Sequence, residues 1–334
     1  TGASAILPPV EGLGTLENIF TLKSIDDGID LKKAMMKEEN KDILIIGAGY
    51  ISVEVIEAAK QLGKNVRVIQ RGKRIIAASF DCEITDIMEK EIRSQGVELH
   101  LEEVVKKVEG NKKVERVVTN KGVYSADIVV IATGVRPTTE FLEGTGIAME
   151  KKAIIIDEEG KTSIDSIYSA GDCAMVYHKV REKNVYIPLA TTANKIGRVV
   201  GENLAGGKNK FNGTLGSACI KVMELEAGRT GITEKEAKLD GLNYKTIIVN
   251  EKNQTDYYPG QEDILIKLIY DAETNVILGG QIIGKKGAVL RVDVLAMAVA
   301  TKMKTSELGM MDFCYAPPFA RTWDALNITG NAAK

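Results

Sequence analysis

Two glycines stand where a buried strand could turn into a helix, in the stretch "KDILIIGAGYISVEVIEAAKQLG". Residues 43–46 form a short apolar run, Gly47 and Gly49 make the turn, and apolar residues recur at helical spacing over 50–62. Such a turn presents backbone N–H groups and the positive end of a helix dipole, which together bind a pyrophosphate. A second apolar run follows, so the stretch has the βαβ pattern of a dinucleotide-binding site. Ser52 replaces the usual third glycine and is small enough for close packing.

The residues after the second predicted strand indicate which nucleotide binds. An NAD site usually carries an acidic residue there, which accepts hydrogen bonds from the ribose 2′-hydroxyl. This chain has Gln70 and Arg71, followed by Lys73 and Arg74. An arginine can bind a 2′-phosphate through two hydrogen bonds, whereas a carboxylate would repel it. The pattern therefore favours NADPH over NADH; the alternative is that these cations only cover a surface loop.

Length and composition set broad limits. The 334 residues suffice for two or three domains, each with its own core. A formal net charge of -2 offers no concentrated basic surface for nucleic acid or an anionic membrane. The chain has neither a long uninterrupted apolar stretch nor a signal-peptide pattern at its start, so we predict a cytoplasmic protein.

The four cysteines are scattered without a C-x-x-C pair, which predicts neither a metal site nor a dithiol redox pair. We expect four small buried thiols at Cys82, Cys173, Cys219 and Cys314.

Two further regions carry structural patterns. Residues 167–170 predict a short strand that ends at Gly171 and Asp172, where a carboxylate could accept hydrogen bonds from sugar hydroxyls. From about Gly216 short β-rich runs alternate with turns, and residues 290–303 then predict a helix. This last third therefore has an α+β pattern.

Six motifs, in order, resemble the pyridine nucleotide-disulfide oxidoreductases, especially the single-cysteine branch: "TGASAILPP", "IIGAGYISVE", "IATGVRP", "SIYSAGDCA", "IPLATTANKIGRVVGENLAGG" and "YAPPFARTWDALN". That branch contains coenzyme A-disulfide reductases, NADH oxidases and peroxidases, and persulfide reductases. The resemblance implies an α/β fold: a Rossmann-like dinucleotide-binding domain with a partial FAD-binding domain, plus an α+β C-terminal dimerisation domain. The implied divisions are a remnant of the FAD-binding domain at 1–23, the NAD(P)-binding domain at 24–154, the second part of the FAD-binding domain at 155–213, and the dimerisation domain at 214–334.

The resemblance also implies a flavoenzyme with FAD and NADPH or NADH, which works as a homodimer. Hydride would pass from the nicotinamide to FAD, electrons from FAD to a cysteine that this chain does not contain, and finally to a small-molecule disulfide or persulfide such as coenzyme A disulfide. Family members open with an FAD-binding unit that runs into A-T-G-x-x-P, and Thr1 and Gly2 match the end of that motif. The opening unit and its redox-active cysteine are therefore expected to be absent, so the parent protein is expected to be the enzyme and this chain by itself to be inactive. Two alternatives remain: an NAD(P)H oxidase or peroxidase, and a non-catalytic nucleotide-binding, dimerising fragment.

Residue by residue, the resemblance places Tyr50 over the nicotinamide-binding face of the flavin and Glu54 near that ring. It supports Tyr315 as a hydrogen-bond donor to a leaving sulfur. Tyr257 and Tyr258 are weaker candidates of the same kind on sequence alone, and simple packing is the alternative for each. A helix beginning near Thr192 would point its positive end at the flavin. The candidate cofactor contacts are Thr1, Gly2, Gly47, Gly49, Tyr50, Ile51, Glu54, Gln70, Arg71, Arg74, Gly134, Gly171, Asp172, Leu189, Ala190 and Thr191.

Overall fold

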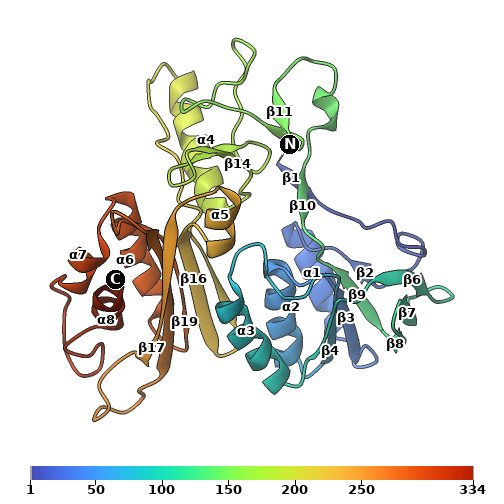
Figure 1. Ribbon diagram of the computed structural model, residues 1–334. Helices are drawn as coiled ribbons and strands as arrows, with labels where there is room; N and C mark the ends of the chain where they lie inside the picture. Colours follow the sequence, from blue (N-terminus) through green and yellow to red (C-terminus); the bar gives the residue numbers. More distant parts are fainter. Residues whose placement is uncertain (1, 334) are drawn as a thin grey trace. The chain divides into compact units, whose positions relative to one another are not determined.

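The computed structural model describes residues 2–333 of the chain (Figure 1). The chain forms two compact units. One comprises Ser4–Val135 and Ile220–Leu225, and the other comprises mainly Arg136–Cys219 and the stretch from Glu226 onward. The predicted α/β class is confirmed, while the predicted boundaries at 23, 154 and 213 stay predictions.

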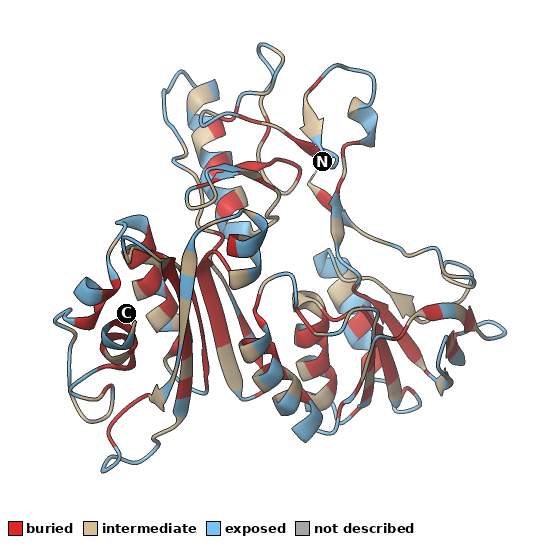
Figure 2. Cartoon of the chain, in the orientation of Figure 1, coloured by how far each residue is buried: buried red, intermediate tan, exposed pale blue. Residues whose placement is uncertain are grey.

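A five-stranded parallel sheet forms the centre of the first unit. Its strands lie in the order β2-β9-β3-β4-β5. The central strands β9 and β3 are buried almost throughout, which explains their nearly continuous apolar sequences (Figure 2). The strands are β2 (Ile19–Phe20), β3 (Asp42–Ile46), β4 (Asn65–Gln70), β5 (Glu98–Leu101) and β9 (Ile128–Ile131).

Three helices and a small antiparallel sheet complete this unit. Helix α2 packs against β3 and β4, and α3 packs against β5. The small sheet shares a hydrophobic core with the parallel sheet, in which Val117 lies among Leu44 and Ile69. The elements are α1 (Ile25–Met35), α2 (Tyr50–Gln61), α3 (Cys82–Ser94), β6 (Val105–Glu109), β7 (Arg116–Thr119) and β8 (Val123–Ser125).

The segment before the C-terminal sheet consists of short elements and one long helix. The predicted strand over 167–170 is wrong: Tyr168 makes only an isolated bridge with Lys161, because the backbone turns at Ser166, whose φ is 65°. Helix α4 begins at Ala190, ahead of the predicted start near Thr192. The elements of this segment are β10 (Val135–Pro137), with which β1 (Ala3–Ala5) from the chain start pairs, then η1 (Glu140–Leu142), β11 (Met149–Glu150), β12 (Ala153–Ile154), β13 (Val176–His178), β14 (Lys183–Val185) and α4 (Ala190–Leu204).

The C-terminal third has the predicted α+β pattern. Its five strands lie in the order β15-β16-β19-β18-β17, and α6 packs against β19 over a continuous buried core. Among residues 2–333, no helix reaches the length and apolarity that crossing a lipid bilayer requires. The elements are β15 (Ala218–Val222), β16 (Leu225–Gly231), α5 (Glu234–Leu239), β17 (Tyr244–Lys252), β18 (Asp263–Asp271), β19 (Ile277–Gly284), α6 (Ala288–Ala300), α7 (Thr305–Gly309) and α8 (Ala325–Ala332).

Candidate functional site

The turn from β3 into α2 requires glycine at its first position. Gly47 has a φ of 101°, and a Cβ there would lie 2.4 Å from the carbonyl oxygen of Ala132. Ala132 follows β9, the strand beside β3, so the two strand ends meet closely at this point. Only a residue without a side chain fits this position.

Gly49 serves a different purpose. It is the N-cap of α2, with an extended backbone (φ −88°), and no described atom lies within 4 Å of where its Cβ would be. Within the described chain, no side chain caps the helix, and its first turn carries no acidic residue. The helix end therefore opens onto free space with its N–H groups available, an arrangement suited to a pyrophosphate.

Ser52 takes over the packing role of the missing third glycine. Its side chain is fully buried, and its hydroxyl donates a hydrogen bond of 2.9 Å to the carbonyl oxygen of Gly47. The serine thus holds the first turn of α2 against the strand end.

Two further candidates follow on the same helix turn. The half-buried Tyr50 has its ring centroid 6.4 Å from that of Phe80, in a tilted arrangement, and Ile51 next to it is also half-buried. Glu54, one turn further on, is solvent-exposed, yet partial burial of its carboxyl raises the pKa above its ordinary value.

The loop after β4 distinguishes between the two predicted arginines. Arg74 forms an ion pair with Asp86 of α3, which raises the pKa of its guanidinium. Arg71 is exposed and makes no hydrogen bond or ion pair to any residue that the structure describes. Gln70 ends β4 and donates to the carbonyl oxygen of Arg74 at 3.3 Å. Because β3 and β4 are parallel neighbours, this loop and the glycine turn both lie at the carboxyl-terminal ends of the strands.

The opening segment lies beside the second Thr-Gly motif. The amide of Ile6 donates to the carbonyl oxygen of Gly134 at 2.9 Å, and the Thr133 hydroxyl donates to the carbonyl oxygen of Ile6 at 2.7 Å. The carbonyl oxygen of Gly2 accepts a bond of 3.0 Å from the amide of Thr138. The predicted candidate Thr1 lies outside the described residues.

The remaining predicted cofactor contacts lie around α4. Gly171 and Asp172 are half-buried in the loop before β13. Leu189 is the N-cap of α4, Ala190 and Thr191 begin the helix, and no side chain of the described residues caps it. This uncapped end resembles that of α2 in offering free N–H groups.

A residue that the sequence did not single out lies in the same region. The hydroxyl of Tyr186 is buried and has no hydrogen-bond partner within residues 2–333. Burial, together with the nearby charge of Asp172, raises the pKa of Tyr186 to about 12. A buried hydroxyl without a partner is costly. The residues around Asp172 therefore fit a polar ligand such as the ribityl chain or phosphates of FAD.

Two tyrosines meet in the C-terminal sheet region. The hydroxyls of Tyr257 and Tyr315 are 2.6 Å apart, although 58 residues separate them in the chain. Both side chains are exposed, and the hydrogen bond that the two hydroxyls share raises the pKa of Tyr315. Tyr258, the other weaker candidate, is exposed as well.

Comparison with known protein families gives two matches, one in each part of the chain. Residues 1–197 match the family described as pyridine nucleotide-disulphide oxidoreductase, and residues 217–326 match its dimerisation domain. The chain belongs to the pyridine nucleotide-disulfide oxidoreductases. The predicted enzyme class is therefore confirmed, as is FAD with NAD(P)H as the cofactor pair of this family.

Individual relatives in the family differ in their reactions. The chain is 39% identical to the NAD(P)H coenzyme A polysulfide/persulfide reductase of Pyrococcus horikoshii, over the whole chain and 74% of the relative. It is 33% identical to an NADH oxidase of Methanocaldococcus jannaschii, again over the whole chain and 74% of the relative. The structure of an NAD-dependent persulfide reductase from A. fulgidus superposes with a TM-score of 0.95 at 35% identity, and the chain spans 62% of it.

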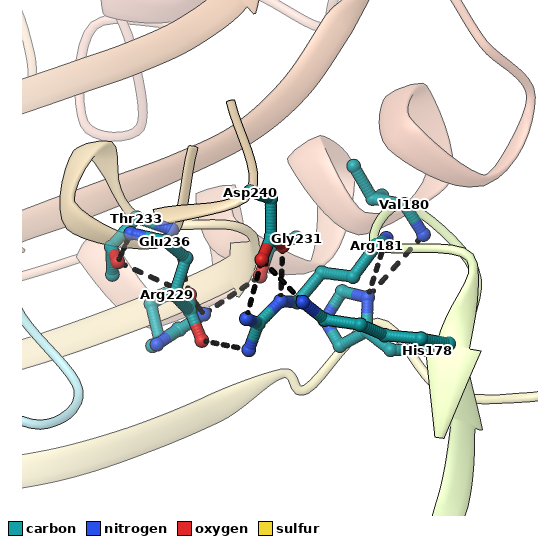
Figure 3. A network of polar contacts seen from close by, with 9 residues as sticks. His178, Val180, Arg181, Arg229, Gly231, Thr233, Glu236 and Asp240 are labelled. Carbon is teal, nitrogen blue, oxygen red and sulfur yellow. Dashed lines mark hydrogen bonds and ion pairs between the residues drawn. The ribbon is translucent and has the colours of Figure 1, made fainter. Parts of the chain in front are cut away.

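A buried polar network outside the family motifs fastens the β13–β14 hairpin to the C-terminal sheet (Figure 3). His178 is fully buried, and its Nδ1 accepts two backbone N–H bonds of 3.3 Å from the following turn. Arg181 pairs with Asp240 at 2.6 Å and with Glu236 at 3.3 Å, and Glu236 pairs with Arg229 at 2.8 Å. Only two histidines occur in the chain, which is the one sequence signal that could have drawn attention to this site.

This network predicts a loss of stability in mild acid. Burial lowers the pKa of His178 to about 4 from its ordinary 6.5. The unfolded chain therefore binds the proton more tightly, so the free energy of unfolding is fully retained above pH 6.5 and falls between pH 6.5 and 4. The fall is about 3 kcal/mol at most. Urea unfolding at pH 7 and pH 5 should show it in the wild type, and His178→Asn should show a flatter pH dependence.

The predicted burial of the cysteines is wrong for three of the four. Cys173 is buried, but Cys82, Cys219 and Cys314 are exposed. Cys82 opens α3 at the surface, and Cys219 takes an outward-facing position on the edge strand β15. In the part of the chain that the structure describes, no three His, Cys, Asp or Glu side chains are grouped to hold a metal ion.

Proposed function

We propose that this chain serves an NADPH-dependent flavoenzyme that reduces the sulfur–sulfur bond of a small-molecule disulfide or persulfide, such as coenzyme A disulfide. The overall change would consume NADPH and one proton per disulfide and release NADP⁺ and two thiols. The observation that carries the nucleotide part is the open, uncapped helix end at Gly49, together with the exposed Arg71 in the loop after the neighbouring strand β4, which has no ion-pair partner among residues 2–333. The persulfide reductases among the relatives support the choice of acceptor.

The chain's own residues would each have a defined task. The turn at Gly47 and Gly49 would bind the nucleotide pyrophosphate, and Arg71 its 2′-phosphate. Tyr50 would cover the nicotinamide side of the flavin. FAD would be held by Asp172 and the start of α4, where the positive helix end favours negative charge on the ring. The chemistry that FAD supplies when bound is the relay of two electrons from nicotinamide to sulfur.

The tyrosine pair would serve the substrate. A leaving thiolate needs a proton or a hydrogen bond, which a phenol can donate. A phenol stays protonated at neutral pH, and the hydrogen bond that Tyr315 shares with Tyr257 raises its pKa further. Both tyrosines are exposed on the dimerisation domain, which supports a homodimer in which they complete the partner's site. A cytoplasmic location remains a prediction.

Removing the Tyr315 hydroxyl should slow disulfide reduction. Tyr257 leaves a second phenol in place, so the expected fall in kcat for Tyr315→Phe is about tenfold, smaller than for loss of a sole acid. The double variant Tyr257→Phe/Tyr315→Phe should lose more. Steady-state kinetics of the flavoenzyme that this chain serves measure both, and an unchanged kcat in the double variant would remove the tyrosines from the reaction.

The reductase and oxidase assignments can be separated directly. The flavoenzyme that this chain serves should oxidise NADPH under anaerobic conditions when coenzyme A disulfide is added, with two thiols formed per NADPH. An NADH oxidase is the second candidate, since such an enzyme is among the relatives. Rapid oxygen consumption with NAD(P)H alone, and no thiol release, would favour that alternative. Failure to retain FAD would favour a nucleotide-binding and dimerising role only.

A further inference from the structure

A buried carboxylate lies beside the loop after β4 that carries Arg71, here called the nucleotide loop. It belongs to none of the family motifs discussed above. Glu103 follows β5 and is only 3% exposed. It accepts hydrogen bonds from the hydroxyls of Thr119 and Tyr124, the latter at 2.8 Å, and His100 Nδ1 lies 3.4 Å from its second oxygen. Burial opposes ionisation, but these donors outweigh it and hold the pKa of Glu103 below its ordinary value. The group is therefore a satisfied buried anion.

The backbone of the same segment holds the nucleotide loop. The amide of Glu103 donates to the carbonyl oxygen of Gln70 at 3.0 Å, and the amide of Glu102 donates to that of Gly72 at 3.1 Å. These two bonds hold the carbonyl groups of the residues before and after Arg71. Glu102 has a φ of 54°, a left-handed conformation that persists only where the surroundings enforce it.

The next residue ties the segment to the opposite side. The amide of Val104 donates to the side-chain oxygen of Asn120 at 2.8 Å, and the backbone amide of Asn120 donates to the carbonyl oxygen of Val104 at 3.0 Å. Thr119, which binds the Glu103 carboxylate, opens the same turn between β7 and β8. The segment 102–104 is thus a bridge between the small antiparallel sheet and the loop that carries Arg71.

We propose that Glu103 is a positioning residue for nucleotide choice: its buried carboxylate anchors this bridge, and the bridge holds Arg71 where the 2′-phosphate of NADPH binds. The inference rests on the proposed role of Arg71. Glu103 itself does not contact the nucleotide. Its loss should therefore reduce the preference for NADPH over NADH rather than weaken both nucleotides equally.

Calorimetric titration with NADPH and NADH tests this role. Glu103→Ala should weaken NADPH binding about tenfold and NADH binding less than about twofold, since only the charged contact through Arg71 is displaced. Glu103→Gln, which keeps an acceptor for the two hydroxyls, should restore most of the preference. Should Glu103→Ala fail to fold, Tyr124→Phe removes one donor while keeping its ring, and should lower the preference about threefold.

A double variant and a matched control make the test decisive. If Glu103 acts through Arg71, Arg71→Ala/Glu103→Ala should bind NADPH no more weakly than Arg71→Ala alone. The carboxylate of Asp127 accepts hydrogen bonds from the backbone amides of Lys41 and Asp42, where β3 begins. This is the opposite end of the strands from the nucleotide loop. Asp127→Ala should therefore leave the preference for NADPH unchanged.

Additive losses, or equal weakening of both nucleotides by Glu103→Ala, would overturn the positioning role. An Arg71→Ala variant with unchanged NADPH affinity would instead overturn the nucleotide choice itself, and the inference with it.

Discussion

Replacing Gly49 with Asp should weaken NADPH binding at least about a hundredfold while leaving the chain folded. The extended backbone and the free space at Gly49 accept a side chain, and Asp is a favourable N-cap residue. Its carboxylate would occupy the N–H groups of the first turn and repel the pyrophosphate. Losing two charge-assisted hydrogen bonds of about 1.5–3 kcal/mol each accounts for the loss in affinity.

The neighbouring glycine supplies the control. Gly47→Ala would place a Cβ 2.4 Å from a backbone oxygen at a positive φ, so it should lower the free energy of unfolding by about 2 kcal/mol or more. Thermal unfolding should therefore separate a folding defect at Gly47 from a binding defect at Gly49. Full-strength NADPH binding by a folded Gly49→Asp variant would show that no pyrophosphate binds at this turn.

Arg71→Ala should weaken NADPH binding about tenfold to a hundredfold and leave NADH binding nearly unchanged. The reason is the loss of one charge-assisted contact to the 2′-phosphate, about 1.5–3 kcal/mol. Gln70→Glu should shift the preference toward NADH, because a carboxylate accepts from the ribose 2′-hydroxyl and repels a phosphate.

A second arginine in the same loop serves as the comparison. Arg74 is already engaged by Asp86, so Arg74→Ala should alter the NADPH preference much less than Arg71→Ala. Equal affinities for NADH and NADPH in the wild type, unaffected by Arg71→Ala, would mean that these cations only cover the loop.

Local patterns made the βαβ stretch of the first unit predictable. The buried run at β3, the Gly47–Gly49 turn and the helical spacing of α2 all lie within one continuous stretch, so periodicity places them closely. The β-rich runs of the C-terminal third and α6 follow for the same reason. The predicted strand at 167–170 failed because the backbone turns at Ser166 and leaves Tyr168 with only one bridge, to Lys161, which the apolar spacing does not indicate.

Contacts between distant residues were not predictable. Nothing in the sequence joins Tyr257 to Tyr315, which come from separate loops, or brings Thr119 and Tyr124 onto the Glu103 carboxylate. The different status of Arg71 and Arg74 also depends on where α3 places Asp86. Side-chain pairing of this kind follows from tertiary packing, which residue spacing alone does not determine.

A calorimetric titration of the wild-type chain with NADPH, and then with NADH, tests the proposed nucleotide site most directly. We expect one saturable site per chain for each nucleotide, with NADPH bound about tenfold to a hundredfold more tightly. Saturable binding of neither nucleotide by the folded chain, or tighter binding of NADH, would contradict a site in which Gly49 opens onto the pyrophosphate and Arg71 binds the 2′-phosphate.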